Sequence, residues 1–269
     1  MFNISAYLNR IKYKKNIDTV SLETLKSLTE SHVFNVPFEN LDIYYKKKVS
    51  LNEFSLFEKI IINRRGGYCY ELSILFNRLL LKLGFNSCLA VARLINSSGI
   101  LNETSVHLVV VVKLQGLWLI DVSWAKGLIY PILIDSDEVQ KQNFSSYKCI
   151  KTDEGIEIWE HLVKDEWKRI YILCMESPAA LEMAYDRNDY HCKNPNSSFQ
   201  KKIIIVKGMT NGFNMLTDEK FTNFMDGTKK DYYFSHEMPF YKFFPNVGLD
   251  ETLKKKFLDS SLNKKKDLP

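Results

Sequence analysis

The stretch R-R-G-G-Y-C-Y-E-L, residues 64–72, places two glycines and a cysteine where a helical pattern begins. We predict a helix that starts after Gly67, carries Cys69 in its first turn and stops at Gly84. Its apolar side is formed by Leu72, Leu75, Phe76, Leu79, Leu80 and Leu83.

Cys69 is predicted to lie on that apolar side, at the helix amino terminus. Partial positive charge and unpaired N–H groups at a helix start stabilise a thiolate. Gly66 and Gly67 would let the backbone turn sharply and leave open space before the sulfur. The local pattern fits two interpretations equally, a nucleophile that meets a substrate and a small buried cysteine.

Composition limits the class of protein. The chain has 269 residues, of which 45% are hydrophobic, which favours two or three subdomains around a shared interior. The net charge of +5 is mild, and the lysine runs at 46–48, 254–256 and 264–266 are short and isolated. We interpret these runs as solvated surface and expect no nucleic-acid partner, although a minor role in attracting a polyanionic cosubstrate stays open.

The five cysteines are scattered and form no C-x-x-C pair. This pattern favours neither a disulfide framework nor a zinc site, so we expect no metal. The amino terminus has no apolar segment of signal-peptide length, and no run approaches a membrane span. We therefore expect no membrane partner and a cytoplasmic location, where thiols stay reduced.

The order of patterns along the chain predicts an α+β fold. The first third is helical, with a helix capped by Ser21, an irregular linker over 32–43 broken by Pro37, and a helix over 51–62. β-branched and aromatic runs then predict strands at 87–95, 106–114, 117–124, 156–159 and 169–173. Strands in succession favour an antiparallel sheet or small barrel rather than a doubly wound sheet. A helix over 177–186, a hairpin around 210–212 and a closing helix over 250–258 complete the expectation.

A thiol nucleophile needs a base, and His107 is the histidine best placed to be held rigidly. It enters an otherwise apolar strand, V-H-L-V-V-V-V, where a hydrogen-bonded core histidine is the alternative interpretation. The other four occupy less ordered surroundings: His32 beside the linker, His161 near a strand end, and His191 and His236 in polar, loop-like stretches.

Asp121 is the corresponding polar residue of the next strand, and a carboxylate among apolar residues requires strong hydrogen bonds. His107 and Asp121 could satisfy each other, and Asp121 would then fix the imidazole tautomer for Cys69. A two-residue turn at Gln115-Gly116 would put the two side chains on opposite faces. The triad therefore predicts an odd-length turn or a bulge, with Gly116 left-handed.

Taken together, these residues resemble the arylamine N-acetyltransferases. R-G-G-Y-C-Y-E resembles that family's R-G-G-x-C-x-E signature, and V-P-F-E-N-L-D-I resembles its V-P-F-E-N block. G-F-N-S-C-L-A-V-A-R-L, the histidine strand, L-I-D-V-S-W-A-K-G and Y-H-C-K-N-P-N-S-S-F-Q match further blocks in order. The resemblance covers most of the chain.

The resemblance implies a helical bundle (1–85), an antiparallel β-barrel (86–190) and an α/β lid (191–269) around a cysteine-protease-like core. It implies a ping-pong transfer of acetyl from acetyl-CoA to an arylamine or arylhydrazine, with Cys69, His107 and Asp121 catalytic. Phe38 and Val106 match positions that contact the aromatic substrate. Glu39, Arg65 and Glu71 match motif positions that we interpret as structural bracing, because removing one buried charge would strand its partner.

Two departures from the family pattern are visible. The family's asparagine after C-x-E-x is Ser73, and its Gly-Phe-Gly is Ser123, Trp124 and Ala125. The family resemblance implies that this loop borders the acceptor pocket and the CoA channel. We therefore expect Trp124 to narrow the substrate cleft and Ser123 and Ala125 to contact the cofactor.

An alternative function is an amide synthase that acts on a biosynthetic acyl chain with the same triad. The oligomeric state is left open.

Overall fold

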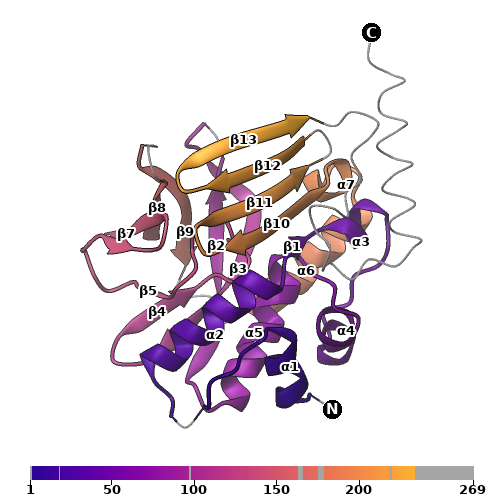
Figure 1. The fold of residues 1–269 in the computed structure, drawn as a ribbon. Helices are drawn as coiled ribbons and strands as arrows, with labels where there is room; N and C mark the ends of the chain where they lie inside the picture. The colour runs from indigo at the N-terminus through magenta and orange to yellow at the C-terminus, as the bar shows by residue number, and fades with distance from the viewer. Residues whose placement is uncertain are drawn as a thin grey trace.

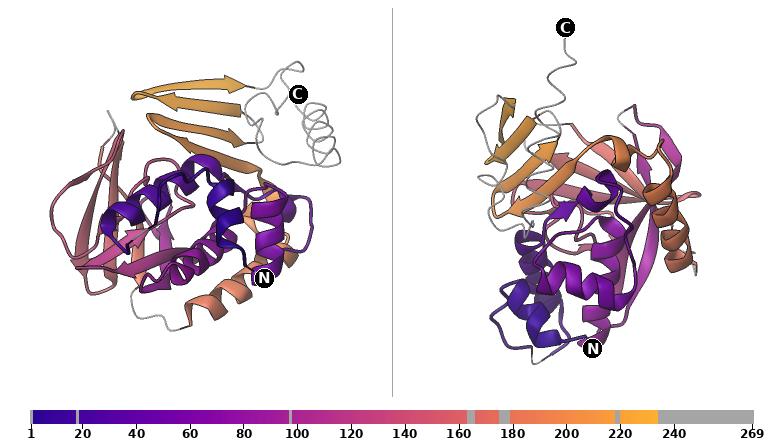
Figure 2. Two further views of the ribbon diagram at one scale, coloured as in Figure 1. Left: turned by 60° about the horizontal axis from the view of Figure 1, so that its bottom comes forward. Right: turned by 90° about the vertical axis from the view of Figure 1, so that its right-hand side faces the viewer.

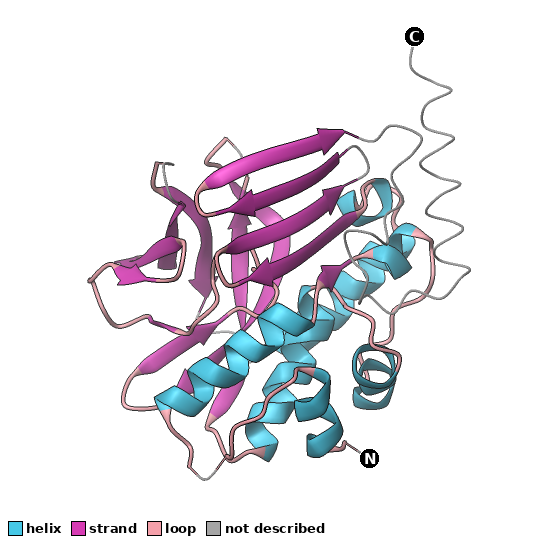
Figure 3. Ribbon diagram, in the orientation of Figure 1, coloured by secondary structure: helices cyan, strands magenta, loops and turns pink. Residues whose placement is uncertain are grey.

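Helices form the amino-terminal part of the chain and cover one side of two sheets (Figures 1 and 3). The computed structural model describes residues 2–17, 19–96, 98–162, 166–174, 179–217 and 220–233, without the side chains of 102–105. The helices of this part are α1 (Ile4–Arg10), α2 (Leu22–Asn35), α3 (Leu41–Tyr44), α4 (Glu53–Phe57), the π-helix η1 (Glu58–Ile62) and α5 (Cys69–Lys82).

The larger sheet has eight antiparallel strands in the order β5-β4-β3-β2-β9-β8-β7-β6 and curls into a nearly closed barrel, seen at the left of Figure 2's left view. Its strands are β2 (Ser87–Ile95), β3 (Leu101–Lys113), β4 (Leu117–Ile120), β5 (Ile132–Leu133), β6 (Gln140–Lys141), β7 (Ser145–Thr152), β8 (Gly155–Leu162) and β9 (Lys168–Cys174).

The smaller sheet has five strands in the order β1-β10-β11-β12-β13 and lies above the helices in Figure 1. Its first strand, β1 (Phe38–Glu39), comes from the amino-terminal part and pairs with β10. The others follow helices α6 (Ala180–Lys193) and α7 (Ser198–Lys201): β10 (Ile204–Met209), β11 (Gly212–Thr217), β12 (Lys220–Met225) and β13 (Thr228–Tyr233).

Strand β3 is buried on both faces, which explains why its sequence is almost uniformly apolar. Its even-numbered residues, from Val106 to Val112, join the core that contains α5. Val109 and Val111 face the barrel interior instead. His107 shares the barrel-facing side, because successive strand residues alternate between faces.

The turn between β3 and β4 has three residues, as the proposed pairing of His107 and Asp121 requires. Lys113 pairs with Leu117, so residues 114–116 form the loop. Gln115 has φ 46° and Gly116 has φ 124°, so the left-handed residue is Gln115 while Gly116 adopts another positive-φ conformation. This register puts His107 and Asp121 on the same face of the sheet.

The glycines before Cys69 serve close packing against the 37–39 segment. The Glu39 amide donates to the Gly67 carbonyl at 2.9 Å, and a Cβ on Gly66 would lie 2.2 Å from the Pro37 carbonyl oxygen. Neither glycine has positive φ; Arg64, with φ 55°, does. Gly66 is therefore needed for this close approach rather than for a turn with positive φ, and the space beside it is filled by Pro37 and Glu39.

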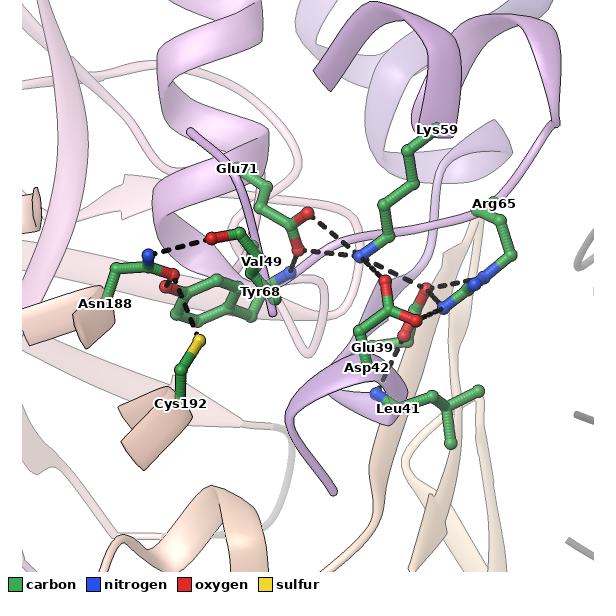
Figure 4. A network of polar contacts seen from close by, with 10 residues as sticks. All are labelled: Glu39, Leu41, Asp42, Val49, Lys59, Arg65, Tyr68, Glu71, Asn188 and Cys192. Atoms are coloured by element: carbon green, nitrogen blue, oxygen red, sulfur yellow. Dashed lines mark hydrogen bonds and ion pairs between the residues drawn. The ribbon is translucent and has the colours of Figure 1, made fainter. Parts of the chain in front are cut away.

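A buried charge network braces the start of α5 (Figure 4). Arg65 donates to Glu39 Oε1 through Nε at 3.0 Å and Nη2 at 2.6 Å. Lys59 Nζ contacts Asp42 Oδ2 at 2.8 Å and Glu71 Oε1 at 2.9 Å. Glu71 Oε2 in turn accepts the Tyr68 amide at 3.1 Å, which caps the helix that carries Cys69. The structural role predicted for Glu39, Arg65 and Glu71 is consistent with these contacts.

Most predicted elements are present, with differences at their ends. The Ser21 side chain accepts the Thr24 amide at the start of α2, as predicted. The linker over 32–43 is wrong in part, since α2 continues to Asn35 and Phe38–Glu39 form a strand. Of the helix over 51–62, the second half is a π-helix. His191 lies on α6 rather than in a loop. The closing helix over 250–258 and His236 lie outside the described residues.

Several strands were not predicted, namely β5, β6, β7, β12 and β13. Residues 121–124 leave the sheet, because β4 ends at Ile120. The hairpin turn lies at Thr210-Asn211, with Gly212 paired to Met209. The boundary drawn at residue 190 falls within α6, and the three-domain division stays a prediction. None of the helices in the described ranges is long and apolar enough to cross a membrane.

Replacing Arg65 with leucine is expected to lower the free energy of unfolding by about 3 kcal/mol, because the buried Glu39 loses both of its hydrogen bonds from the guanidinium and Lys59 is left as the one cation facing Glu39, Asp42 and Glu71 in this network. Urea unfolding followed by circular dichroism would measure this change. As a control, Lys15→Ala removes an exposed ion pair with Glu23 at 3.7 Å and is expected to cost less than about 1 kcal/mol. Equal costs for the two variants would contradict the bracing role.

Candidate active site

His107 and Asp121 form a buried hydrogen-bonded pair across β3 and the end of β4. Their side chains are joined by His107 Nε2 and Asp121 Oδ2 at 2.6 Å. Both residues are buried, with Asp121 fully inaccessible to solvent. Because Nε2 contacts the carboxylate, Nδ1 is the ring nitrogen left for Cys69, whose side chain hydrogen-bonds the imidazole.

The second oxygen of Asp121 is held by the loop that follows it. Oδ1 accepts the Ser123 hydroxyl at 2.7 Å, the Ser123 amide at 3.1 Å and the Trp124 amide at 3.1 Å. The carboxylate therefore has donors on both oxygens, which offsets the cost of burying its charge. Ser123 thus contributes to the orientation of Asp121.

The pair has mutually shifted pKa values. Burial lowers the pKa of His107, but the Asp121 charge and hydrogen bond, together with Cys69, raise it to about 10. For Asp121, burial raises the pKa, while His107 and the hydrogen bonds from Ser123 lower it below the ordinary value. Both shifts favour an imidazolium–carboxylate ion pair at neutral pH.

Helix α5 is fastened to β3 on both sides of His107. The Tyr70 hydroxyl donates to the Val106 carbonyl at 2.7 Å. The Ser73 hydroxyl donates to the Leu108 carbonyl at 2.6 Å. These two bonds fix the helix that carries Cys69 against the strand that carries the imidazole.

A cavity of about 340 Å³ opens onto Cys69 and His107. It is enclosed between the barrel, the five-stranded sheet and the α6–α7 segment. Its remaining lining residues are Phe38, Leu94, Ile95, Asn96, Val106, Ser123, Trp124, Lys126, His191, Ser198, Phe199, Ile204 and Val206. This mixture of apolar walls and a few polar groups is typical of a small-molecule site.

Most of the residues predicted from the sequence line this cavity. The nucleophile and base candidates lie there with Phe38, Val106 and Trp124, and so does Ser123. Asp121 lies behind His107. Ala125, the other residue expected to contact the acyl donor, is fully buried and does not line the cavity.

The other nine lining residues were not predicted, among them Lys126, His191 and Phe199. His191 Nδ1 contacts the Ser197 hydroxyl at 2.9 Å, and its ring packs 4.9 Å from that of Phe199. Burial, assisted by Arg187, lowers the pKa of His191 to about 4, so it is neutral near pH 7. One sequence signal could have identified His191: Y-H-C-K belongs to the same matched block as the P-x-S-x-F stretch. The prediction that His191 lies in a loop led us to overlook this signal.

The chain is similar to several known proteins. A sequence profile described as N-acetyltransferase matches residues 21–257. The arylamine N-acetyltransferase of Escherichia coli K12 is 29% identical over 230 residues, which cover 83% of this chain and 80% of that protein.

Two solved structures have the same fold. Mycobacterium marinum arylamine N-acetyltransferase in complex with CoA gives a TM-score of 0.83 at 22% identity, covering 96% of this chain and 99% of that one. A Bacillus cereus arylamine N-acetyltransferase, described as having a Cys-His-Glu catalytic triad, gives 0.76 at 27% identity over 87% and 94% of the two chains. With the profile matching well over half of its length, the chain belongs to the arylamine N-acetyltransferase family.

Proposed function

We propose that this protein transfers an acetyl group from acetyl-CoA to the nitrogen of an arylamine or arylhydrazine, by a ping-pong route through acetyl-Cys69. The observation that carries the proposal is the contact series from Cys69 through His107 to Asp121 at the wall of a partly apolar cavity. The family membership supplies the acetyl-transfer chemistry. A CoA complex of a structural neighbour supports the donor.

In the first half-reaction the Cys69 thiolate attacks the thioester carbonyl, and a new C–S bond forms as the bond to the CoA sulfur breaks. The imidazolium of His107 gives its proton to the departing CoA thiolate. His107 is thereby left neutral beside acetyl-Cys69. Asp121 holds the ring so that Nδ1 stays directed at the sulfur throughout.

In the second half-reaction the amine nitrogen attacks the acetyl carbon, and the bond to Cys69 breaks. His107 takes the proton that the nitrogen loses, which restores the thiolate–imidazolium pair and releases the amide. One residue thus serves as acid and then as base, so the two half-reactions balance without another proton carrier.

The aromatic walls of the cavity suit an aromatic acceptor. Phe38 and Phe199 lie with ring centroids 6.3 Å apart, and Trp124 lines the same cavity beside His107. Offset or edge-on stacking on such rings would hold an aryl group with its nitrogen near the sulfur.

A cytoplasmic location is part of this proposal, since reducing conditions keep the thiol available.

Brief exposure of the purified protein to acetyl-CoA is expected to add the mass of one acetyl group, because among the five cysteines, all of which the structure describes, Cys69 is the one that lines the cavity with His107. Intact-mass spectrometry would detect the adduct. Cys69→Ala should lose the adduct and reduce turnover by at least about 10³-fold. Cys88→Ser, which changes an exposed cysteine, is the matched control and should keep both.

A wild-type protein that stays unmodified by acetyl-CoA but is acylated by another thioester would refute acetyl-CoA as donor. That outcome would favour the amide synthase, the alternative activity for the same triad. An acetyl adduct of equal yield in Cys69→Ala would instead refute the proposed nucleophile.

Asp121→Asn is expected to return the imidazole of His107 to the neutral form at pH 7, because the lowering effect of burial on the His107 pKa is then opposed by Cys69 without the charge of Asp121. Imidazole ¹⁵N NMR would follow this, with the wild-type ring remaining protonated until the pH approaches about 10. Turnover should fall by roughly 10³–10⁴-fold, as when a triad carboxylate is neutralised. A protonated ring in the variant at pH 8 would contradict the role given to Asp121.

The pair should also make stability depend on pH. His107 has a raised pKa in the folded state, so its contribution is full below its ordinary pKa of 6.5 and is lost as the pH rises toward about 10. Asp121 has a lowered pKa, so its contribution is present above its ordinary 3.8 and is lost in acid. The stability gap between wild type and Asp121→Asn should therefore be largest between these two ordinary values.

A further inference from the structure

Glu160 is a buried carboxylate to which the proposed acetyl transfer assigns no role. It lies on β8, at the inward-facing position that follows Ile156 and Ile158. Its Oε1 accepts the indole N–H of Trp124 at 2.8 Å and the Tyr147 hydroxyl at 2.5 Å. Burial raises the pKa of this carboxyl, and the two donors and Lys126 oppose that rise. Such a group is retained in an apolar barrel only while its donors stay in place.

Trp124 connects this carboxylate to the cavity. Its side chain lines the cavity, and its ring packs edge-on against the rings of His107, at 6.2 Å, and Tyr171, at 5.9 Å. The bond to Glu160 adds a directional constraint to these contacts. The phenylalanine that the family resemblance places here has no N–H and could not be held in this way.

The loop that carries Trp124 is packed directly onto Glu160 and Tyr147. A Cβ on Gly127 would lie 2.6 Å from the Tyr147 hydroxyl oxygen and 3.1 Å from Glu160 Oε1. The Ser145 hydroxyl also donates to the Gly127 carbonyl at 2.8 Å. The 121–127 segment is thus fixed at both ends, by Asp121 at its start and by the Glu160 cluster at Trp124 and Gly127.

We propose that Glu160 is a positioning residue that holds Trp124 as a rigid wall of the cavity beside Cys69 and thereby makes the protein prefer single-ring arylamines and arylhydrazines over fused-ring acceptors. The inference rests on the proposed acetyl transfer and deepens it. The cavity, at about 340 Å³, is near the lower end of small-molecule sites, which run from roughly 300 to 1,000 Å³. An indole that cannot rotate away keeps the cavity at this size, which disfavours a fused ring system relative to a single ring.

The test compares kcat/KM for 4-methylaniline, a single-ring acceptor, with that for 2-aminofluorene, a fused-ring acceptor. Glu160→Leu removes the hydrogen-bond acceptor and should lower the preference for the single ring by about tenfold, mainly through KM for the larger amine. Glu160→Gln keeps an oxygen for both donors and should restore most of the preference. A preference unchanged in Glu160→Leu would overturn the proposal.

Two further variants locate the effect at Trp124. Tyr147→Phe removes the other donor to the same oxygen and should leave the preference close to wild type. On a Trp124→Phe background, which has no indole N–H, Glu160→Leu should produce no further loss. An undiminished loss on that background, or an equal loss in Tyr147→Phe, would show that Glu160 acts through the barrel interior, against the proposal.

A measurement on the wild-type protein that does not depend on activity can test the proposal even if Glu160→Leu does not fold. In ¹H–¹⁵N NMR spectra of the wild type, the Trp124 indole proton, assigned with Trp124→Phe, should exchange slowly with solvent, whereas rapid exchange would overturn the proposal. A wild-type protein that acetylates neither amine would refute the proposed function. The indole exchange rate would still decide whether Glu160 holds Trp124.

Discussion

The site depends on the register set by the three-residue turn at 114–116. Side chains of a strand alternate between faces, so one residue more or fewer in this turn would send His107 and Asp121 to opposite sides of the sheet. Gln115 and Gly116 both take positive φ there, and a Cβ on Gly116 would meet the Leu133 side chain at 2.7 Å. The geometry of an ion pair inside the molecule is thus fixed by backbone conformation near its surface.

A second constraint is the balance of charge at the start of α5. Three carboxylates, from Glu39, Asp42 and Glu71, share two cations, Lys59 and Arg65. Burial raises the pKa of Glu71 to about 7, against the opposing effect of Lys59. Asp42 behaves in the opposite way: despite its burial, Lys59 and Arg65 lower its pKa to about 2. Glu71, which caps the helix carrying Cys69, therefore takes up a proton more readily than Asp42 does as the pH falls.

The sequence predicted the fold class and brought Cys69, His107 and Asp121 together. Each prediction used a local or periodic signal: the start of a helix for Cys69, and a polar residue in an otherwise apolar strand for His107 and Asp121. The alternation of side chains along a strand then required an odd number of residues in the turn between the two strands. The sequence did not predict Glu160, since a single acidic residue in a short strand looks the same whether it faces solvent or a barrel interior. The sequence analysis identified Gly66 as a position that needs glycine, but it attributed this need to a sharp turn rather than to the close approach of another segment. The backbone that approaches this glycine comes from Pro37, and sequence distance conceals that contact.

Strand β3 has both faces covered by separate apolar cores and both edges paired, with β2 and β4. A segment in this position exposes its backbone only when most of the surrounding molecule opens, so its local unfolding free energy approaches that of the whole fold. The imidazole of His107, which is attached to this strand, is displaced only when the strand itself unfolds. The imidazole therefore keeps its place in the molecule for as long as the folded protein lasts, even where the loops around the cavity fluctuate.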